Sequence, residues 1–286
     1  MENLTGMREQ AKKCVSKSQV IPSAGRKAAG LKKGVLFPQE AESRGNMYRF
    51  LSTVYLRPPT KDLVRHIADM EFLDEVSSLF GEVAVADLKE FAATVTIADS
   101  GKRLASLKQE YMDLFAVPTG RYTTPFEDVH WGKTVDGKQN RGPLMGERAI
   151  AVRRIYRGAG AEMDRENKEL PTHIGVELSF MNFLCEREVE ALQNEEGGGM
   201  NDEEKRKNTE FTLYRKLQLS FLQEHLNLWF PQLSQSIQAN AKSELYRGLA
   251  LITEEFLRWD TAGLLTQSPV EKHMRAQKTS MQPQTG

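Results

Sequence analysis

Helical periodicity of the apolar residues is the feature that most constrains the fold of this chain. Between residues 40 and 262, apolar side chains recur three and four positions apart, the pattern of helices with one buried face. The clearest such stripe includes Leu178, Met181 and Cys185. No stretch alternates apolar and polar residues long enough to predict a strand. The sequence therefore predicts an all-α protein: a single helical-bundle domain of about ten helices, with no sheet.

The two ends of the chain differ from this helical part in composition. Residues 1–38 contain eight Lys and Arg against two Glu and show little periodicity, so we expect a disordered basic tail. A nucleic-acid-binding arm is the alternative, but the basic residues are not interleaved with aromatic ones. Residues 263–286 are polar and are expected to be a second disordered tail. Residues 39–262 would then form the all-helical domain.

Composition also bounds the location and the partners of the protein. The formal net charge is zero, so no overall field favours nucleic acid or a membrane surface. No run approaches the 18 or so apolar residues of a membrane span, so stable membrane insertion is not expected. Cys14 and Cys185 are the two cysteines, which argues against a disulfide framework and for a reducing compartment. The N-terminal residues lack the apolar segment of a secretory signal. We therefore expect a cytoplasmic protein.

A long loop, residues 117–141, interrupts the helical pattern. Val117-Pro118 ends the preceding helix, because a residue before proline leaves the α region and proline has no N–H. Loops of this length inside compact domains are usually functional or disordered, and apolar and aromatic content argues against disorder here. The first candidate site combines the end of that helix with the Pro-aromatic-acidic run of the loop: Tyr111, Leu114, Phe115, Pro125, Phe126, Glu127 and Asp128.

A second candidate site lies at the start of the clearest helix. Pro171 fixes the direction in which the chain enters, and Thr172 stands where an N-cap hydroxyl would accept a backbone N–H. His173 then falls in the first turn, where the helix dipole disfavours a positive imidazole. The alternative is a plain helix start with a surface histidine. The residues of this hinge are Glu169, Pro171, Thr172 and His173.

Signatures of cofactor chemistry are missing from the sequence. There is no His-Glu-x-x-His, no Cys-x-x-Cys, no phosphate-binding glycine loop and no dinucleotide fingerprint, so we predict neither a metal nor another cofactor. Glu127 and Asp128 could act as an acid/base pair with His173, as in a small helical hydrolase or nucleotide-handling enzyme. Adjacent carboxylates in a loop more often face solvent or a partner. The sequence therefore favours a protein that is not an enzyme.

Three motifs together resemble the TorD/DmsD/NarJ family, cytoplasmic chaperones of molybdenum-cofactor oxidoreductases. The run Tyr111 to Phe115, followed by Pro125-Phe126-Glu127, resembles the family's aromatic-x-x-Leu-Phe and Pro-aromatic-Glu-Ser loop. The run Glu169 to His173 resembles its Glu-x-Pro-x-Asp-His hinge, and His225 to Pro231 resembles its C-terminal pattern. The likeness covers residues 44–260. Residues 144–147 and 173–178 look closest to the branch that serves periplasmic enzymes of the dimethyl sulfoxide reductase type.

The chain departs from the family pattern at two positions. Asp128 stands where the loop motif has serine, and Thr172 stands where the hinge motif has aspartate. Thr172 keeps a capping hydroxyl but removes a carboxylate beside His173. If that carboxylate helps hold a basic peptide, Glu169, Glu127 or Asp128 would have to supply the charge.

The resemblance implies a chaperone that binds the apo catalytic subunit of a molybdenum-cofactor oxidoreductase, its twin-arginine signal peptide, or both. The partners would be the molybdopterin-containing subunit and its leader, and the protein itself would be a monomer or a domain-swapped dimer. The loop and the hinge would meet across a helical groove, where carboxylates and apolar residues suit a basic, partly apolar leader. Charge reversal at Glu127 and Asp128, or Phe126→Ala, should then weaken peptide binding without unfolding. A purely structural helical adaptor is a third possibility.

Overall fold

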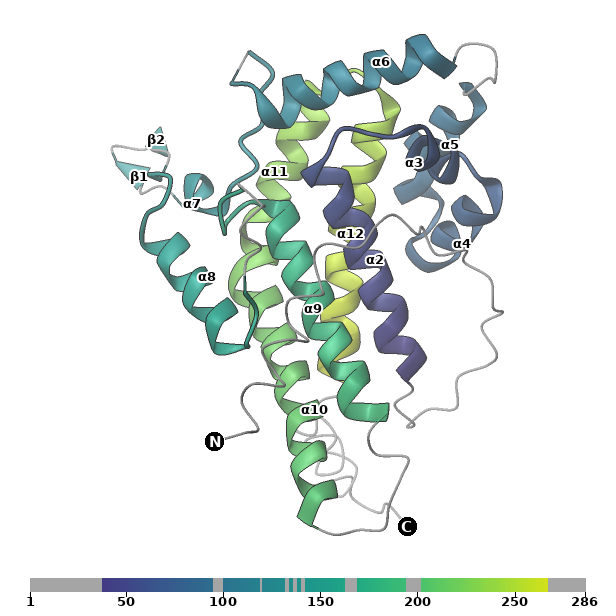
Figure 1. Cartoon of the computed structure of the whole chain (residues 1–286). Helices are drawn as coiled ribbons and strands as arrows, with labels where there is room; N and C mark the ends of the chain where they lie inside the picture. Colours follow the sequence, from purple (N-terminus) through teal and green to yellow (C-terminus); the bar gives the residue numbers. More distant parts are fainter. Residues whose placement is uncertain are drawn as a thin grey trace, which may run out of the picture.

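The computed structural model describes residues 38–94, 100–118, 120–131, 134–135, 138–139, 142–162, 169–193 and 202–266. Nearly all of these residues are helical (Figure 1), which confirms the all-α class. Two short strands, β1 (Thr134–Val135) and β2 (Lys138–Gln139), pair antiparallel within the long loop. Strands of two residues leave no periodic signal, so the sequence did not indicate this ribbon. Residues 1–37 and 267–286, which hold most of the two expected tails, lie outside the described residues.

The helices follow one another in the chain with few residues between them. In order they are α2 (Pro38–Leu56), α3 (Lys61–Ile67), α4 (Met70–Phe80), α5 (Glu82–Thr94), α6 (Ser100–Tyr111), α7 (Glu127–His130), α8 (Glu147–Gly158), α9 (Ile174–Gln193), α10 (Asp202–Phe221), α11 (Asn227–Asn240) and α12 (Glu244–Thr266). Two π-helical turns continue α6 and α10: η1 (Met112–Ala116) and η2 (Leu222–Leu226). Because α12 runs to Thr266, the helical domain extends past its expected end at residue 262.

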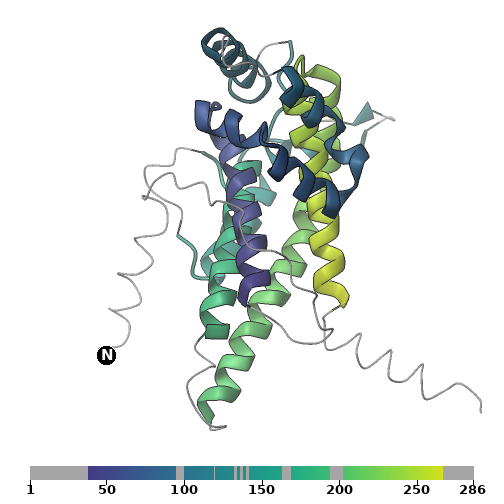
Figure 2. The same ribbon diagram turned by 90° about the vertical axis from the view of Figure 1, so that its right-hand side faces the viewer.

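Four long helices, α2, α9, α10 and α12, lie side by side along the length of the molecule, and α6 crosses one end of them (Figures 1 and 2). Their inner faces share one apolar cluster with α5 and α11. The largest of its fully buried side chains are Trp229, Tyr48, Tyr55, Phe91, Phe221, Phe230 and Phe256. One continuous core of this size explains why the helical residues fold as a unit.

Helix α9 starts in close contact with α2, and a glycine makes this possible. A Cβ atom added at Gly175 would lie 2.5 Å from Cγ of Leu56 and 3.2 Å from the carbonyl oxygen of Ser52. Any side chain at residue 175 would therefore push α9 away from α2. The Ser52 hydroxyl instead donates to the Gly175 carbonyl at 2.7 Å. This contact fixes the point at which the hinge enters α9.

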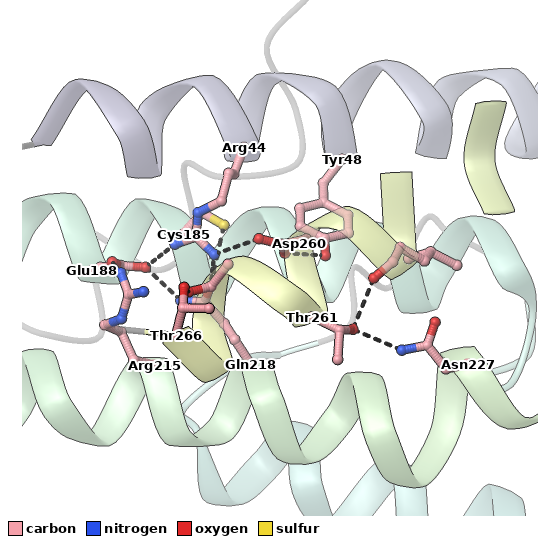
Figure 3. A network of polar contacts seen from close by, with 12 residues as sticks. Arg44, Tyr48, Cys185, Glu188, Arg215, Gln218, Asn227, Asp260, Thr261 and Thr266 are labelled. Atoms are coloured by element: carbon pink, nitrogen blue, oxygen red, sulfur yellow. Dashed lines mark hydrogen bonds and ion pairs between the residues drawn. The ribbon is translucent and has the colours of Figure 1, made fainter. Parts of the chain in front are cut away.

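A buried network of charged side chains ties the four long helices together, here called the Arg44 cluster (Figure 3). The Arg44 guanidinium on α2 donates to Asp260 of α12 at 3.0 Å and to Glu188 of α9. Gln218 of α10 accepts from Arg44 at 2.7 Å and donates to Glu188 at 2.8 Å, while Arg215 also pairs with Glu188 at 2.8 Å. Burial lowers the pKa of Arg44, but the attraction of Asp260 and Glu188 outweighs it, so the pKa stays well above its usual value. Its two arginines and two carboxylates balance in charge.

Candidate functional site

The loop and the hinge, far apart in sequence, lie against each other. The Glu127 N–H donates to the Thr172 carbonyl at 2.9 Å, and the Ile174 N–H donates to the Pro125 carbonyl at 2.9 Å. These two bonds form a single antiparallel bridge between Phe126 and His173, whose rings meet edge to face at 5.2 Å. The prediction that the two stretches come together is confirmed. We call this contact the loop–hinge junction.

The π-helical turn η1 holds the start of the loop. The Leu114 carbonyl accepts two bonds from Thr123, from the N–H at 2.9 Å and from the hydroxyl at 2.8 Å. The Tyr111 hydroxyl donates to the Tyr55 carbonyl at 2.9 Å. Tyr111, Leu114 and Phe115 are all buried in the main core. These three residues therefore position the loop from beneath it.

Backbone strain concentrates in the segment between η1 and α8. Of the non-glycine residues that the structure describes, Thr124 (φ 55°) and Met145 (φ 61°) alone have positive φ. A β-branched residue in this conformation is a steric outlier, and such outliers cluster at binding and catalytic sites. Each is held by a hydrogen bond: the Thr124 carbonyl contacts His130 Nε2 at 2.9 Å, and the Met145 N–H donates to Asp128 Oδ2 at 2.7 Å.

The two residues that depart from the family pattern are hydrogen-bonded to each other. The Thr172 hydroxyl donates to Asp128 Oδ1 at 2.5 Å, and both side chains are buried. The expected role of Thr172 as N-cap is wrong, because α9 begins at Ile174 and the residue that precedes it is His173. His173 takes over the capping role, since its Nδ1 accepts the Gly175 N–H at 3.0 Å. A carboxylate at 128 and a hydroxyl at 172 exchange the positions that the family pattern gives them.

His173 is a buried, neutral histidine, so the alternative of a surface side chain is also wrong. Desolvation lowers its pKa to about 3. Because Nδ1 accepts a backbone N–H, the neutral ring carries its proton on Nε2. The imidazole is thus a fixed structural group of the junction.

Glu127 is fully buried at 0% exposure and belongs to a second charged cluster, here called the Glu127 cluster. Nδ1 of His225, on η2, lies 2.9 and 3.0 Å from its two carboxylate oxygens, and Arg148 lies 3.8 Å away. Glu177 of α9 completes the cluster and accepts the Trp229 indole N–H at 2.9 Å. The expectation that Glu127 and Asp128 face solvent or a partner is therefore wrong, because both are acceptors inside the fold.

The pKa of Glu177 is raised in this arrangement. Burial raises its pKa well above the usual value, and the negative charge of Glu127 raises it further. Its Oε1 is buried and has no donor facing it. A proton on this carboxyl group turns one oxygen into a donor toward Glu127, as in other pairs of adjacent carboxyl groups. The loop thus meets two other motifs: the hinge at Phe126 and the C-terminal pattern at Glu127.

Comparison with known proteins identifies the family. A family model described as the nitrate reductase delta subunit matches residues 81–235. The chain belongs to the nitrate reductase delta subunit family. This assignment confirms the resemblance that the three motifs indicated.

Curated members of related function are all named as chaperones. The chaperone protein TorD of Colwellia psychrerythraea strain 34H is 21% identical over 247 residues, which cover 80% of this chain and 94% of the relative. The perchlorate reductase assembly chaperone protein of Dechloromonas aromatica is 24% identical over 108 residues, covering 38% and 42%. The selenate reductase assembly chaperone protein of Thauera selenatis is 26% identical over 148 residues, covering 51% and 65%. The chain thus spans less than two thirds of the latter two. The prediction of a chaperone, as opposed to an enzyme, is confirmed at the level of the family.

Three residues of the Glu127 cluster were missed as site residues from the sequence: Glu177, His225 and Trp229. Glu177 is a carboxylate within an otherwise apolar helix face, between Ile174 and Leu178, and this misfit was the available signal. His225 and Trp229 are four positions apart, on one side of a helical segment, within the family's C-terminal pattern. What the sequence could not supply was the contact of His225 with Glu127 and of Trp229 with Glu177.

Only part of the junction is accessible from outside. Phe126 is half-buried, and Trp131, at 39% exposure, stacks beneath the Arg148 guanidinium at 3.6 Å from the ring centre. Together with Met145, these residues form what we call the rim: Phe126, Trp131, Met145 and Arg148. Of the carboxylates expected at the site, Glu169 is the one that keeps partial exposure, and burial raises its pKa.

The geometry offers little to the enzyme alternative. Glu127, Asp128 and His173 are buried, and each is already hydrogen-bonded within the fold. Among the described residues, no three His, Cys, Asp or Glu side chains are arranged to hold a metal ion. Of the helices that the structure describes, none is both long and apolar enough to cross a membrane.

Proposed function

We propose that this chain is the cytoplasmic assembly chaperone of a molybdenum-cofactor oxidoreductase. It would bind the cofactor-free catalytic subunit, its twin-arginine leader, or both, until the cofactor is inserted. The observation that carries the proposal is the convergence of all three family motifs on one junction with a partly exposed rim. The names of the relatives point to the same class of client.

Within this proposal the eleven expected site residues divide into two groups. Phe126 and Glu169 are partly exposed and would touch the client directly. The others are buried or bonded within the fold and would position these two: Tyr111, Leu114, Phe115, Pro125, Glu127, Asp128, Pro171, Thr172 and His173. An apolar stretch of the leader would pack on Phe126 and Trp131, and its basic start would approach Glu169.

This division changes which substitutions test binding. Charge reversal at Glu127 places a cation beside His225 and Arg148 in a buried cluster, so it should destabilise the fold by about 3–5 kcal/mol. The earlier expectation of weakened binding without unfolding therefore does not hold for Glu127 or Asp128. It is kept for Phe126→Ala, which shortens a half-buried side chain.

Recovery of the client from the native host tests the proposal. The full chain carrying an affinity tag is purified under mild conditions, and bound proteins are identified by mass spectrometry. We expect a molybdopterin-containing catalytic subunit that lacks its cofactor and retains its leader. Recovery without any molybdoenzyme subunit would contradict the proposal and leave a structural adaptor as the better account. Titration with the synthetic leader then separates leader binding from binding of the enzyme body.

A further inference from the structure

The outward face of α8 is strongly cationic. Ala149, Val152 and Tyr156 bury one side of this helix against the protein. The opposite side carries Ile150, Arg153, Arg154 and Arg157, at spacings of three, one and three that place them on one surface. We call these four residues the arginine face. In Figure 1, α8 lies at the edge of the molecule, below α7 and the β1–β2 ribbon.

The three arginines of this face have no counter-ion in the described structure. Several other arginines do: Arg65 pairs with Asp62 at 2.9 Å, and Arg187 and Arg258 each pair with a glutamate on their own helix. Among the described residues, no carboxylate forms an ion pair with Arg153, Arg154 or Arg157. One carboxylate, Glu147, is exposed at the N-terminal end of α8. The face therefore presents an uncompensated positive field.

Exposed apolar residues continue this surface toward the rim. Ile150 is 58% exposed, and Leu144 and Met145, in the turn before α8, are 51% and 45% exposed. Met145 is bonded to Asp128 through its N–H, and Arg148 stacks on Trp131. The arginine face and the loop–hinge junction are thus connected through the first turn of α8.

We propose that the arginine face, with Ile150 and Leu144, binds an acidic segment on the folded body of the client enzyme. This inference rests on the proposed function. A twin-arginine leader is itself basic and would be repelled here, so the contact is separate from the leader site. Guanidinium groups pair with carboxylates in a planar, bidentate way, and Arg, Met and Trp are the residues enriched in protein interfaces.

Two other classes of partner fit the face less well. A helix that lies on a lipid surface needs its apolar side free, but that side of α8 is buried, and the Tyr156 hydroxyl donates to the Pro171 carbonyl at 2.8 Å. Single-stranded nucleic acid is recognised by aromatic residues that stack on bases, whereas the exposed apolar side chains between these arginines and the turn are aliphatic. An acidic protein surface matches both the charge and the aliphatic residues.

The test compares two triple charge reversals of the full chain. One is Arg153→Glu/Arg154→Glu/Arg157→Glu. The control is Lys61→Glu/Lys102→Glu/Lys108→Glu, which makes the same change in net charge at exposed positions on α3 and α6. The probe is the cofactor-free catalytic subunit recovered with the unsubstituted chain, immobilised for binding kinetics. We expect association about tenfold slower for the α8 variant, within about twofold for the control, and a weaker salt dependence for the α8 variant alone.

Further outcomes separate the inference from the proposed function. Unchanged association of the α8 variant would overturn the inference and leave the proposed function intact. Failure of the unsubstituted chain to recover any molybdoenzyme subunit would overturn both. Vesicles containing phosphatidylglycerol and polyuridylate RNA are tested in parallel, and binding of either that the α8 reversal abolishes would also overturn the inference. If circular dichroism shows that the reversal unfolds the chain, Arg153→Gln/Arg154→Gln/Arg157→Gln replaces it with the same expected order.

Discussion

The Arg44 cluster and the Glu127 cluster both bury charged side chains, but their charges are balanced differently. In the first, Arg44 and Arg215 face Glu188 and Asp260, so the cations and anions are equal in number. In the second, Glu127 and Glu177 lie close together, and the nearest arginine, Arg148, is partly exposed and 3.8 Å from Glu127. The charges of the first cluster balance, whereas in the second burial and the nearby charge of Glu127 raise the pKa of Glu177.

Position in the fold matches this difference. The Arg44 cluster joins four long helices, and its hydrogen bonds within the described part of the chain do not reach the loop or the hinge. The Glu127 cluster lies directly under the rim, where Glu127 follows Phe126 in the chain. Buried polar groups next to a binding surface can be kept for specificity at a cost in stability. We therefore infer that the Arg44 cluster stabilises the helix bundle and that the Glu127 cluster positions the residues of the binding surface.

The largest effect on stability is expected from Arg44→Met. Removing the guanidinium leaves Glu188 and Asp260 buried with one cation fewer, which should lower the free energy of unfolding by about 3–5 kcal/mol in urea titrations. Arg49→Met is the control on the same helix, because Arg49 is 51% exposed and 4.0 Å from Glu186. Its cost should stay below about 1 kcal/mol. Equal losses in the free energy of unfolding for the two variants would contradict this stabilising role of the Arg44 cluster.

The bond between Asp128 and Thr172 should account for the next largest effect. Asp128→Ala leaves the Thr172 hydroxyl and the Met145 N–H without their acceptor, at a cost of about 2–3 kcal/mol. Asp128→Ser/Thr172→Asp exchanges the two groups as in the family pattern and should recover a large part of this loss. A double-mutant cycle measures the coupling. If the double variant loses as much free energy of unfolding as Asp128→Ser and Thr172→Asp lose together, the two side chains are not exchangeable.

Acid should weaken the junction through His173. Its pKa is about 3 in the folded protein and about 6.5 in an unfolded chain, so the unfolded state binds more protons between these values. The stabilising contribution is present above pH 6.5 and is lost as pH falls, by about 2 kcal/mol at pH 5. His173→Asn keeps a capping acceptor but cannot titrate there. Between pH 8 and pH 5, the free energy of unfolding should fall more steeply for the unsubstituted chain than for His173→Asn. Parallel curves for the two proteins would exclude a contribution of His173 to this pH dependence.

The last prediction concerns protonation of Glu177. Because its pKa is raised in the folded state, the folded protein keeps a proton that the unfolded chain releases, and stability declines as pH rises above the usual carboxyl range. Glu177→Gln keeps an acceptor for Trp229 and should remove this decline. Infrared difference spectra at neutral pH should show a protonated carboxyl band that Glu177→Gln abolishes. If Glu177 instead gives the band of an ionised carboxylate, the proposed difference in protonation between the two clusters is wrong.

Most of the helices were predictable from the sequence, because burial of one helix face makes apolar residues recur three and four positions apart. The break at Val117-Pro118 and the meeting of loop and hinge were also predictable, the first from proline chemistry and the second from the family motifs. The burial of Glu127 and Asp128 was not. Whether a carboxylate faces water depends on partners such as His225 and Met145, which are distant in sequence or supply only a backbone N–H.

The Arg44 cluster illustrates the same limit. Arg44 and Asp260 are more than 200 residues apart, and each alone looks like an ordinary surface residue of an amphipathic helix. Only the packing of α2 against α9 and α12 turns them into a buried pair. Local patterns thus predicted elements, whereas the polar contacts between elements required the structure.

Binding of the client by a rim variant tests the central claim most directly. Phe126→Ala/Trp131→Ala removes the two aromatic side chains of the rim, and Leu79→Ala/Val83→Ala is the control with exposed apolar residues of α4 and α5. Affinity for the cofactor-free catalytic subunit is measured by calorimetry, with unfolding followed in parallel. We predict at least about tenfold weaker binding for the rim variant and no change for the control. Equal affinity of a folded rim variant and the unsubstituted chain would contradict the account.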